Sequence, residues 1–544
     1  MKQTKIKSTA LIYIFVINIA LSGLIGCDDF LEETNRTSIT DANGLSDPDT
    51  YDQFVAEAYN QLREALVNFG LDHQGTDIAT REDLITGVSE LNDYVNINPS
   101  NGTVTDYWKA YYEVILAANN VELVSGQVQG LSDAARDLGL AEALFIRAYA
   151  YFHLVENYGD VPLVVEEVDL NALNFVKSPE EQVYDQMVAD LQQAIAGLPE
   201  TVTVFGRATK DAAKHLLAKV LLTRGYKSYA NSNDFEEAAR LAEEVIANHP
   251  LEDSYAELVS IDNQRNSEVI FSVLYGPDAL SRGPGGVRHT FFKFSYDVYP
   301  GLNRSNTYGR GNGQMVTPFF ISLFEDDDER EAATLRRVVY AVEDFAETDD
   351  GPVVIAVGDT AIYFPKVPWS QAEIDSKVYA VINPDTYFEI NFGNGVAAPM
   401  FLKFDDPTVP YANPGIAPGG IRDAILMRAG ETRLIAAEAY LNAGNAGTAA
   451  DHLNAIRTRA GASVIQANDV DLDLILDESA RELAGEVSRW MELKRTGKLM
   501  ERVLAHNPHA ALNNSIETCH VVRPIPQNDI DATNRSLIQN SCYQ

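Results

Sequence analysis

The sequence contains few of the residues that build metal centres and disulfide frameworks. Its 544 residues include three cysteines and nine histidines, which argues against a Cys-rich zinc module or a small disulfide scaffold. Basic residues are also scarce, because 42 Lys and Arg face 79 Asp and Glu, for a net charge of −37. Phosphate binding needs clustered Lys and Arg, so neither a nucleic-acid partner nor a polybasic attachment to lipid is expected.

Catalytic signatures are missing as well. The sequence has no H-E-x-x-H, G-x-S-x-G or G-x-x-x-x-G-K-[ST] motif, each of which marks a specific chemistry. A glycosidase places two carboxylates across a sugar bond, but among 79 acidic residues such pairs carry no information. The Asp326-Asp327-Asp328 run is interpreted as solvated charge, and His506-x-x-His509 as a loop. We therefore predict no metal, no cofactor and no enzymatic activity.

Long apolar runs are absent apart from one near the N-terminus. Residues 10–20 are apolar except for one Asn and follow three lysines, and this run is too short for the roughly 20 residues that span a bilayer. It is typical of a signal peptide. The segment ends in Leu24-Ile25-Gly26-Cys27, which resembles the bacterial lipobox. We predict a signal peptide over residues 1–26 and a lipid on Cys27; the alternative is a plain secretory signal with an incidental cysteine.

An acidic tether is predicted over residues 27–50. Asp28, Asp29, Glu32 and Glu33 follow the cysteine at once. This arrangement resembles the surface-export signal of Bacteroidota lipoproteins, and the alternative is a solvated linker. The predicted location is the outer membrane, through the N-terminal lipid, with the protein facing the cell exterior.

The rest of the chain divides into two helical regions and a different segment between them. Apolar residues recur at three- and four-residue steps across much of residues 51–254, and again near 430–460 and 477–504 within 426–544; this spacing predicts helices. Residues 255–425 alternate β-branched and aromatic runs with Gly and Pro clusters, which predicts short strands and long loops. The fold class is therefore mainly α, with a loop-rich insert.

Two helical segments have the same pattern of small residues. Residues 218–225 and 437–444 match at Ala, Leu and Gly positions, and each precedes an Ala-rich second helix. A Gly just after a helix suits its C-terminal turn. The pattern resembles degenerate tetratricopeptide helix pairs, and generic antiparallel helix hairpins are the alternative.

An ordered set of short motifs resembles the SusD/RagB family of outer-membrane lipoproteins. The set runs from the lipid cysteine to the second-last residue, and one departure is Ser541-Cys542, where the family usually has Pro-Gly. The matching pieces are Cys27-Asp-Asp-Phe-Leu, Trp108-x₂-Tyr111-x₃-Ile115-x₂-Ala118-Asn119, Ala141 to Ala148 (AEALFIRA), Tyr158 to Leu163 (YGDVPL), Thr209-Lys210-x-Ala212-Ala213, Arg428 to Tyr440, Leu453 to Gly461, Glu478 to Arg495, Pro524-Ile525-Pro526 and Gln539-Asn540-x₂-Tyr543.

The resemblance implies a fold, a ligand class and a partner. The fold would be a right-handed helical scaffold of tetratricopeptide-like units, with the insert carrying the ligand face. The ligand would be an oligosaccharide or another nutrient taken up at the cell surface. The partner would be a SusC-like TonB-dependent transporter, over whose pore the lipoprotein acts as a lid. A second hypothesis is a tetratricopeptide-type scaffold that binds proteins through its helices. The large non-helical insert over residues 255–425 favours the first hypothesis, because a bare scaffold has little use for it.

Most residues of the family motifs are interpreted as structural. Arg147 and Arg489 lie on otherwise apolar or acidic helices and are predicted to form buried or interfacial ion pairs. Trp108 and Trp490 lie on helix stripes and are predicted to be core residues.

A sugar site needs exposed aromatic rings beside polar side chains. The stretch 287–313 is rich in aromatics, and Phe292, Phe294 and Tyr296 alternate as in a buried strand. Tyr299 and Tyr308, among Pro, Gly, Asn and Arg, are predicted to be exposed, and Trp369 lies outside the helices. The predicted ligand-binding residues are Asp77, Arg81, Asp93, Tyr94, Asn96, Tyr296, Tyr299, Tyr308 and Trp369.

With Cys27 lipidated, two thiols are left. Cys519 and Cys542 flank a segment with two prolines and little helical pattern, and disulfides persist outside the cytoplasm. We predict a disulfide between them; two separate thiols are the alternative.

Overall fold

The protein was analysed as a computed structural model. The predicted lipid-bearing Cys27 and the acidic residues after it lie outside the residues that the structure describes. Those residues are 45, 47–68, 70–82, 89–165, 174–304, 307–308, 314–348, 351–388, 396–408 and 419–544.

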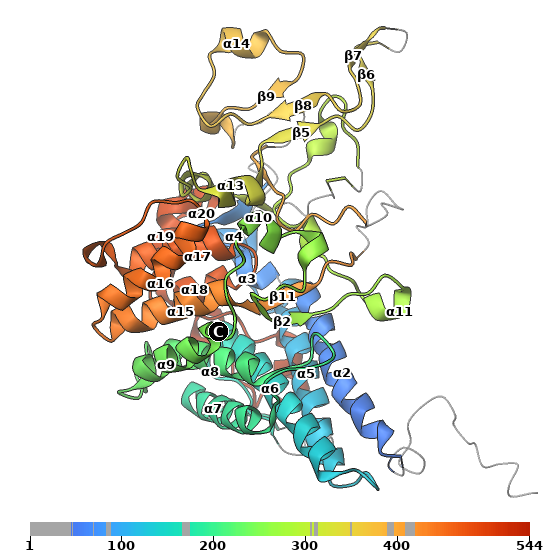
Figure 1. The fold of residues 1–544 in the computed structure, drawn as a ribbon, viewed down its shortest axis with the longest axis vertical. Helices are drawn as coiled ribbons and strands as arrows, with labels where there is room; N and C mark the ends of the chain where they lie inside the picture. The colour runs from blue at the N-terminus through green and yellow to red at the C-terminus, as the bar shows by residue number, and fades with distance from the viewer. Residues whose placement is uncertain are drawn as a thin grey trace, which may run out of the picture.

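A helical body is built from both ends of the chain (Figure 1). Asn101, Ser132 and Thr209 each cap the helix that follows by accepting a backbone N–H at its first turn. The N-terminal helices are α2 (Asp49–Ala65), α3 (Gly70–His73), α4 (Glu90–Asp93), α5 (Gly102–Ser125), α6 (Asp133–Tyr158), α7 (Glu180–Gly197), α8 (Lys210–Arg224) and α9 (Asp234–Ile246). Between α2 and α5 the described residues form only short elements.

The C-terminal helices complete the body. The helical pattern predicted over 477–504 is divided among three helices, because Gly485 and Gly497 adopt φ of 76° and 71° between them, a conformation that glycine reaches without strain. The helices are α15 (Ala429–Asn442), α16 (Ala446–Arg459), α17 (Leu472–Leu483), α18 (Arg489–Arg495), α19 (Leu499–His506), α20 (Pro508–Asn513) and α21 (Gln527–Ala532).

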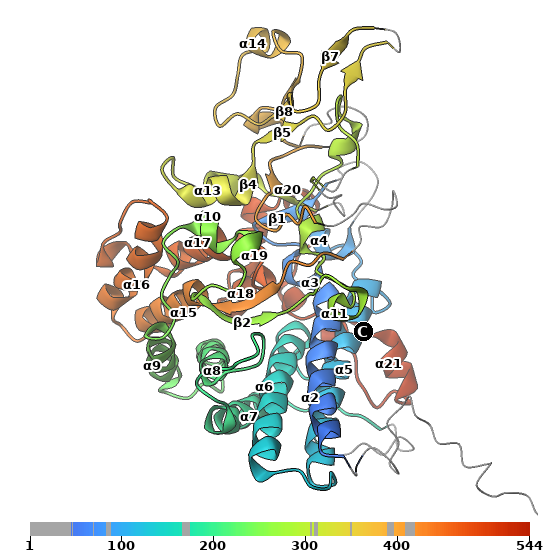
Figure 2. The same ribbon diagram turned by 45° about the vertical axis from the view of Figure 1, so that its right-hand side comes forward.

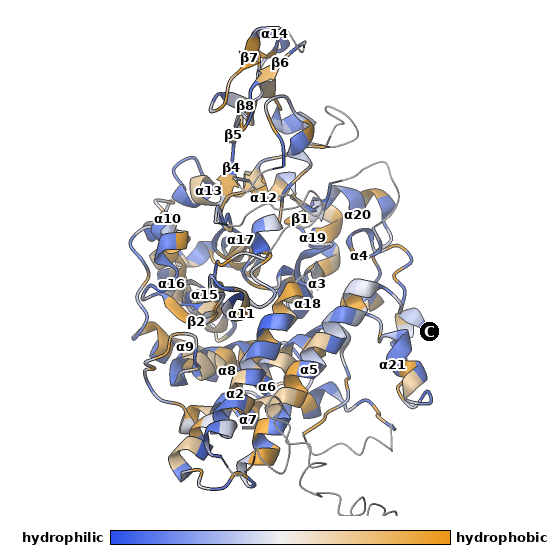
Figure 3. Ribbon diagram, turned by 90° about the vertical axis from the view of Figure 1, so that its right-hand side faces the viewer, coloured by the Kyte–Doolittle hydropathy of each residue, from blue (hydrophilic) through white to orange (hydrophobic). Residues whose placement is uncertain are grey.

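The two predicted helix pairs are present. Helix α8 packs on α9, α15 packs on α16, and α9 also packs against α15, so the two pairs meet. Figure 2 shows them stacked on one side of the body. In Figure 3 the body helices carry both hydrophilic and hydrophobic stretches, as expected of helices with one buried face.

Helix α6 forms the centre of the N-terminal half. By length and composition it could cross a membrane, but 83% of its apolar window is buried inside the protein. It packs against α5 and α7. Arg147 on this helix pairs with Asp190 at 2.8 Å, and Trp108 on α5 is buried, which confirms both predictions for these residues.

Residues between the helical regions supply short strands, as predicted. Strand β2 (Val269–Val273) pairs with β11 (Ala424–Arg428) beside the helices. Further pairs are β1 (Ala79–Arg81) with β3 (Gln314–Val316), and β4 (Leu335–Arg336) with β10 (Met400–Phe401). The short helices here are α10 (Tyr255–Leu258), α11 (Ala279–Arg282), α12 (Pro318–Ser322) and α13 (Glu329–Thr334).

Part of the insert projects from the body as a lobe, which we define as residues 338–388 (Figures 1 and 2). Its sheet has the order β5 (Val338–Tyr340), β8 (Thr360–Tyr363) and β9 (Ala380–Val381). A second pair, β6 (Phe345–Ala346) with β7 (Val353–Ile355), and helix α14 (Gln371–Asp375) lie at its far end.

The aromatic stretch beginning at residue 287 is buried, but not as a strand. Phe292, Phe294 and Tyr296 belong to a second apolar core beneath the lobe, so their predicted burial is confirmed. The predicted strand is wrong, because 3₁₀ turns cover Arg288–Thr290 and Tyr296–Val298 and Phe292 has φ of 52°.

A buried ion-pair network joins the insert to the C-terminal helices. Glu478 and Glu482 on α17 bind Arg330 of α13 at 2.7 and 3.1 Å. Glu482 also binds Arg428 at 2.6 Å and Arg459. Burial alone would raise the pKa of Glu482, but the three arginines hold it far below its usual range. We call this cluster the α17 network.

The chain ends in a tail that is tied to the body. A disulfide joins Cys519 and Cys542, whose Cα atoms are 5.5 Å apart; this is the pairing predicted from the sequence.

The α17 network yields a stability prediction. We expect Glu482→Gln to lower the free energy of unfolding by about 3–5 kcal/mol, because it leaves buried arginines without their counter-charge. Urea unfolding followed by circular dichroism measures it. The control is Glu237→Gln, which breaks an exposed pair with Arg240 and should cost under about 1 kcal/mol. Equal effects of the two variants would contradict the network's role.

Candidate functional site

Most of the predicted ligand residues are buried. Asp77 is bound by Arg489 at 2.7 Å and by Arg502 at 2.8 Å. Burial alone would raise the pKa of Asp77, but the two arginines hold it below its usual value. The ion pair predicted for Arg489 is thereby confirmed, and Asp77 is occupied inside the protein.

The residues around α4 lie together beside Asp77. Arg81 pairs with the buried Asp93 at 3.2 Å. The Tyr94 hydroxyl donates to the Gly75 carbonyl at 2.6 Å and accepts from the indole of Trp490 at 3.2 Å, and Trp490 is fully buried, as predicted. Of this group Asn96 alone is exposed. The ligand roles predicted for Asp93 and Tyr94 are therefore not supported.

The predicted exposure of Tyr299 and Tyr308 is wrong. The Tyr308 hydroxyl bonds the backbone of Tyr340 on β5, and Arg336 covers its ring at 4.8 Å. Tyr299 packs edge-on against Phe294 with ring centroids 6.0 Å apart. Tyr296, also predicted as a ligand residue, is fully buried. The exposure of Tyr299 and Tyr308 was predicted from their polar sequence neighbours. These neighbours gave no sign that the rings belong to the apolar core under the lobe.

Trp369 differs from the tyrosines because it remains partly exposed. Its backbone N–H donates to the side chain of Asn383, whose amide donates back to the Trp369 carbonyl, both at 2.9 Å. The indole ring lies 5.2 Å from that of Tyr363 and 5.6 Å from the Lys377 ammonium. The backbone of Trp369 is thus fixed, and its ring, next to Tyr363 and Lys377, stays partly exposed.

An open cleft of about 250 Å³ lies at the base of the lobe. We call it the lobe-base cleft. Lys366, three residues before Trp369, and Pro384, directly after Asn383, line the cleft, whereas Trp369 itself is not among its lining residues. Its lining residues are Pro318, Ile321, Ser322, Phe324, Asp326, Glu331, Arg337, Lys366, Pro384 and Tyr387.

The cleft combines apolar and paired charged groups. Glu331 binds Lys366 at 2.6 Å and Arg337 at 2.5 Å, so neither cation is left without a counter-charge. The Asp326 side chain is 98% exposed at the edge, which agrees with the solvated charge run predicted there. Asp328, by contrast, is buried and binds Arg330. The sequence signal for this cleft was weak, because its lining residues match no motif and come from separate segments, 318–337, 366 and 384–387.

A second open hollow, of about 310 Å³, lies beside α2 and α6, and its one aromatic lining residue, Tyr51, is buried. The other hollows are smaller. A cavity between α3, α6 and α8 holds about 40 Å³, room for a few water molecules. Its wall includes Asp72, His73 and His153, and the Tyr107 hydroxyl bonds both Asp72 at 3.0 Å and His153 at 2.6 Å. Burial lowers the pKa of His73 and of His153 to about 3 and raises that of Asp72 to about 6.

These buried histidines predict a loss of stability in acid. The unfolded chain binds a proton at His153 below its ordinary pKa of 6.5, whereas the folded protein does not until about pH 3, so stability falls as pH falls from 6.5. Asp72 has the opposite effect on stability. Between pH 6 and 3.8 its carboxyl is protonated in the folded protein but not in the unfolded chain, so this group adds stability as pH falls. We expect His153→Gln to reduce the slope near pH 5 by about 1.4 kcal/mol per pH unit.

Urea unfolding at pH 5, 6 and 7 measures this slope. His249→Gln is the matched control, because His249 lies at the surface beside Asp211. An unchanged slope in His153→Gln would refute the account of the buried ring.

Comparison with known proteins places the chain among relatives of one kind. A family model described as "Starch-binding associating with outer membrane" matches residues 29–222, and one described as "SusD family" matches residues 267–543. SusD-like protein P25 of Formosa agariphila is 26% identical over 96% of both chains. Starch-binding protein SusD of Bacteroides thetaiotaomicron is 25% identical over 77% of this chain and 75% of its own length.

A solved structure has the same fold. Surface glycan-binding protein A of Bacteroides thetaiotaomicron, in complex with laminarihexaose, superposes with a TM-score of 0.66 at 21% identity. The match covers 90% of this chain and 99% of that one. The mainly helical, SusD-like architecture predicted from the motifs is therefore confirmed.

Proposed function

Because the chain belongs to the SusD family, we propose that it is a cell-surface lipoprotein that binds an oligosaccharide and delivers it to a SusC-like TonB-dependent transporter. In this role it is a binding protein and not an enzyme. Relatives named for binding starch, and one solved with laminarihexaose, support a glycan as the ligand class.

The observation that carries the proposal is the open lobe-base cleft, together with the partly exposed Trp369 on the segment that follows the lining residue Lys366. Sugars present CH-rich faces that stack on aromatic rings and hydroxyls that bond to polar side chains. Trp369 supplies a partly exposed ring, and Asp326 supplies an exposed carboxylate that accepts hydroxyl protons. The cleft is open, so a chain longer than the cleft can extend out of it. Asn96 and Arg81 on the α4 side remain proposed additional contacts.

Anchoring belongs to the same proposal. The lipobox-like Cys27 would hold the protein in the outer membrane, since acyl chains contribute about 0.8 kcal/mol per buried CH₂. A family description that names association with the outer membrane supports this location.

The cleft predicts a specific loss of binding. We expect Trp369→Ala to weaken binding of the glycan about thirtyfold, because losing a stacked interfacial ring commonly costs about 2 kcal/mol. Asp326→Asn should weaken it by a smaller factor. Titration calorimetry with laminarin and starch oligosaccharides measures both, and circular dichroism checks that the fold is retained.

The matched control is Leu116→Ala, which removes an exposed side chain of α5 on the body and should bind as wild type. If both cleft variants bind a confirmed glycan normally, the site lies elsewhere. If no glycan in a broad panel binds the wild-type protein, the ligand class is wrong.

The anchor predicts a change of cell fraction. Cys27→Ala should move the protein from the membrane pellet to the soluble fraction, because the lipid attachment atom is lost. Immunoblotting of fractionated cells measures this, and a Cys519→Ala, Cys542→Ala double variant serves as control because it keeps the anchor. Retention of Cys27→Ala in the pellet would contradict lipidation at that residue.

A further inference from the structure

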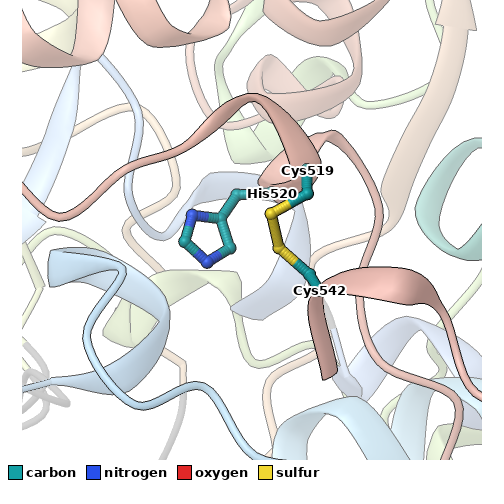
Figure 4. A group of neighbouring side chains, drawn as sticks. All are labelled: Cys519, His520 and Cys542. Carbon is teal, nitrogen blue, oxygen red and sulfur yellow. A yellow bond between two sulfur atoms is a disulfide. The ribbon is translucent and has the colours of Figure 1, made fainter. Parts of the chain in front are cut away.

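The C-terminal disulfide lies beside a histidine. Cys519 and His520 are on the 3₁₀ turn η8 (Thr518–Val521), and Cys542 is on η9 (Ser541–Tyr543). All three side chains are partly exposed. A ring nitrogen of His520 and the two sulfur atoms lie within 4.8 Å of one another. Figure 4 shows the imidazole ring next to the bridge. The bridge is therefore within reach of small solutes and of a proton donor.

The histidine tautomer is fixed by the backbone. The Glu517 N–H donates to Nδ1 of His520 at 2.9 Å, so the neutral ring carries its proton on Nε2. Burial lowers the pKa of His520, and the charge of Arg523 lowers it further against the opposing effect of Glu517. At neutral pH the ring is thus an uncharged N–H donor.

The two sulfurs have different neighbours. The Glu517 carboxylate lies 3.9 Å from Cys519 Sγ, and a nearby negative charge disfavours a thiolate at that sulfur. Among the hydrogen bonds of the described residues, none joins a carboxylate to Cys542. When the bridge opens, the negative charge is therefore better placed on Cys542 than on Cys519.

A buried positive charge lies in the same tail. The Arg523 guanidinium is fully buried, and it faces the rings of Trp490 at 4.2 Å and Tyr94 at 5.8 Å. None of the ion pairs found in the described part of the chain involves Arg523. Its charge acts on the residue beside the bridge, because it lowers the pKa of His520.

The tail does not depend on the bridge alone. The Asn540 side chain donates to the carbonyls of Tyr158 at 2.9 Å and of Arg523 at 2.8 Å. The Tyr543 hydroxyl donates to the Val522 carbonyl at 2.9 Å. These bonds hold both sides of the bridge when the sulfur–sulfur bond is open.

We propose that Cys519–Cys542 is a reversible thiol–disulfide exchange site for low-molecular-mass thiols, attacked at Cys519 and assisted by His520. A thiolate RS⁻ forms a bond to Cys519 Sγ as the bond between the two cysteines breaks, and Cys542 leaves as a thiolate beside the His520 N–H. A second thiol then attacks the mixed disulfide and releases RSSR. Two thiols are oxidised, the protein disulfide is reduced, and the thiol protons pass to the cysteines.

The position of the first adduct tests the proposal directly. The full-length protein is treated with reduced glutathione at pH 7, quenched with acid, and analysed by peptide mass spectrometry. We expect the glutathione adduct on Cys519. An adduct found on Cys542, or a bridge that millimolar glutathione leaves intact, would overturn the proposal.

The rate of reduction tests the role of His520. We expect His520→Ala to slow the appearance of free thiols by about three- to tenfold, because the leaving thiolate loses its stabilising neighbour. His520→Gln keeps an N–H donor, so its reduction rate should lie between those of the wild type and His520→Ala. His249→Ala, which alters a histidine on the body, should react as wild type, and an unchanged rate in His520→Ala would refute the assistance.

Glu517→Gln tests the asymmetry of the bridge. Removing the charge next to Cys519 should spread the adduct over both cysteines, with the tail still folded. An adduct that stays wholly on Cys519 in this variant would show that the carboxylate does not direct the attack.

Discussion

Burial of charge on α17 is the constraint on which the assembly of the fold depends. Glu478 and Glu482 are removed from water, and such carboxylates persist only when counter-charges surround them. Their partners come from far along the chain, with Arg330 in the insert and Arg428 at the end of β11. The network favours this docking of the insert, because an arrangement that separates Arg330 from α17 would leave buried charges unpaired. The lobe and its cleft follow α13 in the chain, so the ion pairs that hold Arg330 against α17 help to fix their position.

Local sequence patterns predicted the helical body well. Helical periodicity, small residues at helix contacts and capping residues act over a few positions, so the long helices lie within residues 51–254 and 426–544, as the patterns indicate. The pairing of Arg147 and the burial of Trp490 also followed from the sequence, because a charge on an apolar helix needs a partner and a ring on a helix stripe needs a core.

The candidate site was harder to predict because its exposure is decided by contacts between distant segments. Tyr308 lies among polar residues, yet β5 and Arg336 cover it. Asp77 has the chemistry of a sugar ligand, but Arg489, about 400 positions later, occupies it. Conversely, Glu331 and Lys366 meet in the cleft although strands β4 to β8 lie between them in the sequence. A single sequence carries no local sign of such long-range contacts. Of the aromatic residues predicted to bind the ligand, only Trp369 is partly exposed.

The apolar character of α6 has a consequence for export. Under the proposed export, the chain crosses the inner membrane before it folds, when no partner helix covers this segment. A helix of its length and hydropathy is then a candidate for lateral release into the bilayer. Arg147 lies near its centre, where a charged residue costs about 2.5–3.5 kcal/mol in lipid. In the proposed export, the arginine that pairs with Asp190 in the folded protein would also oppose arrest of this helix in the membrane.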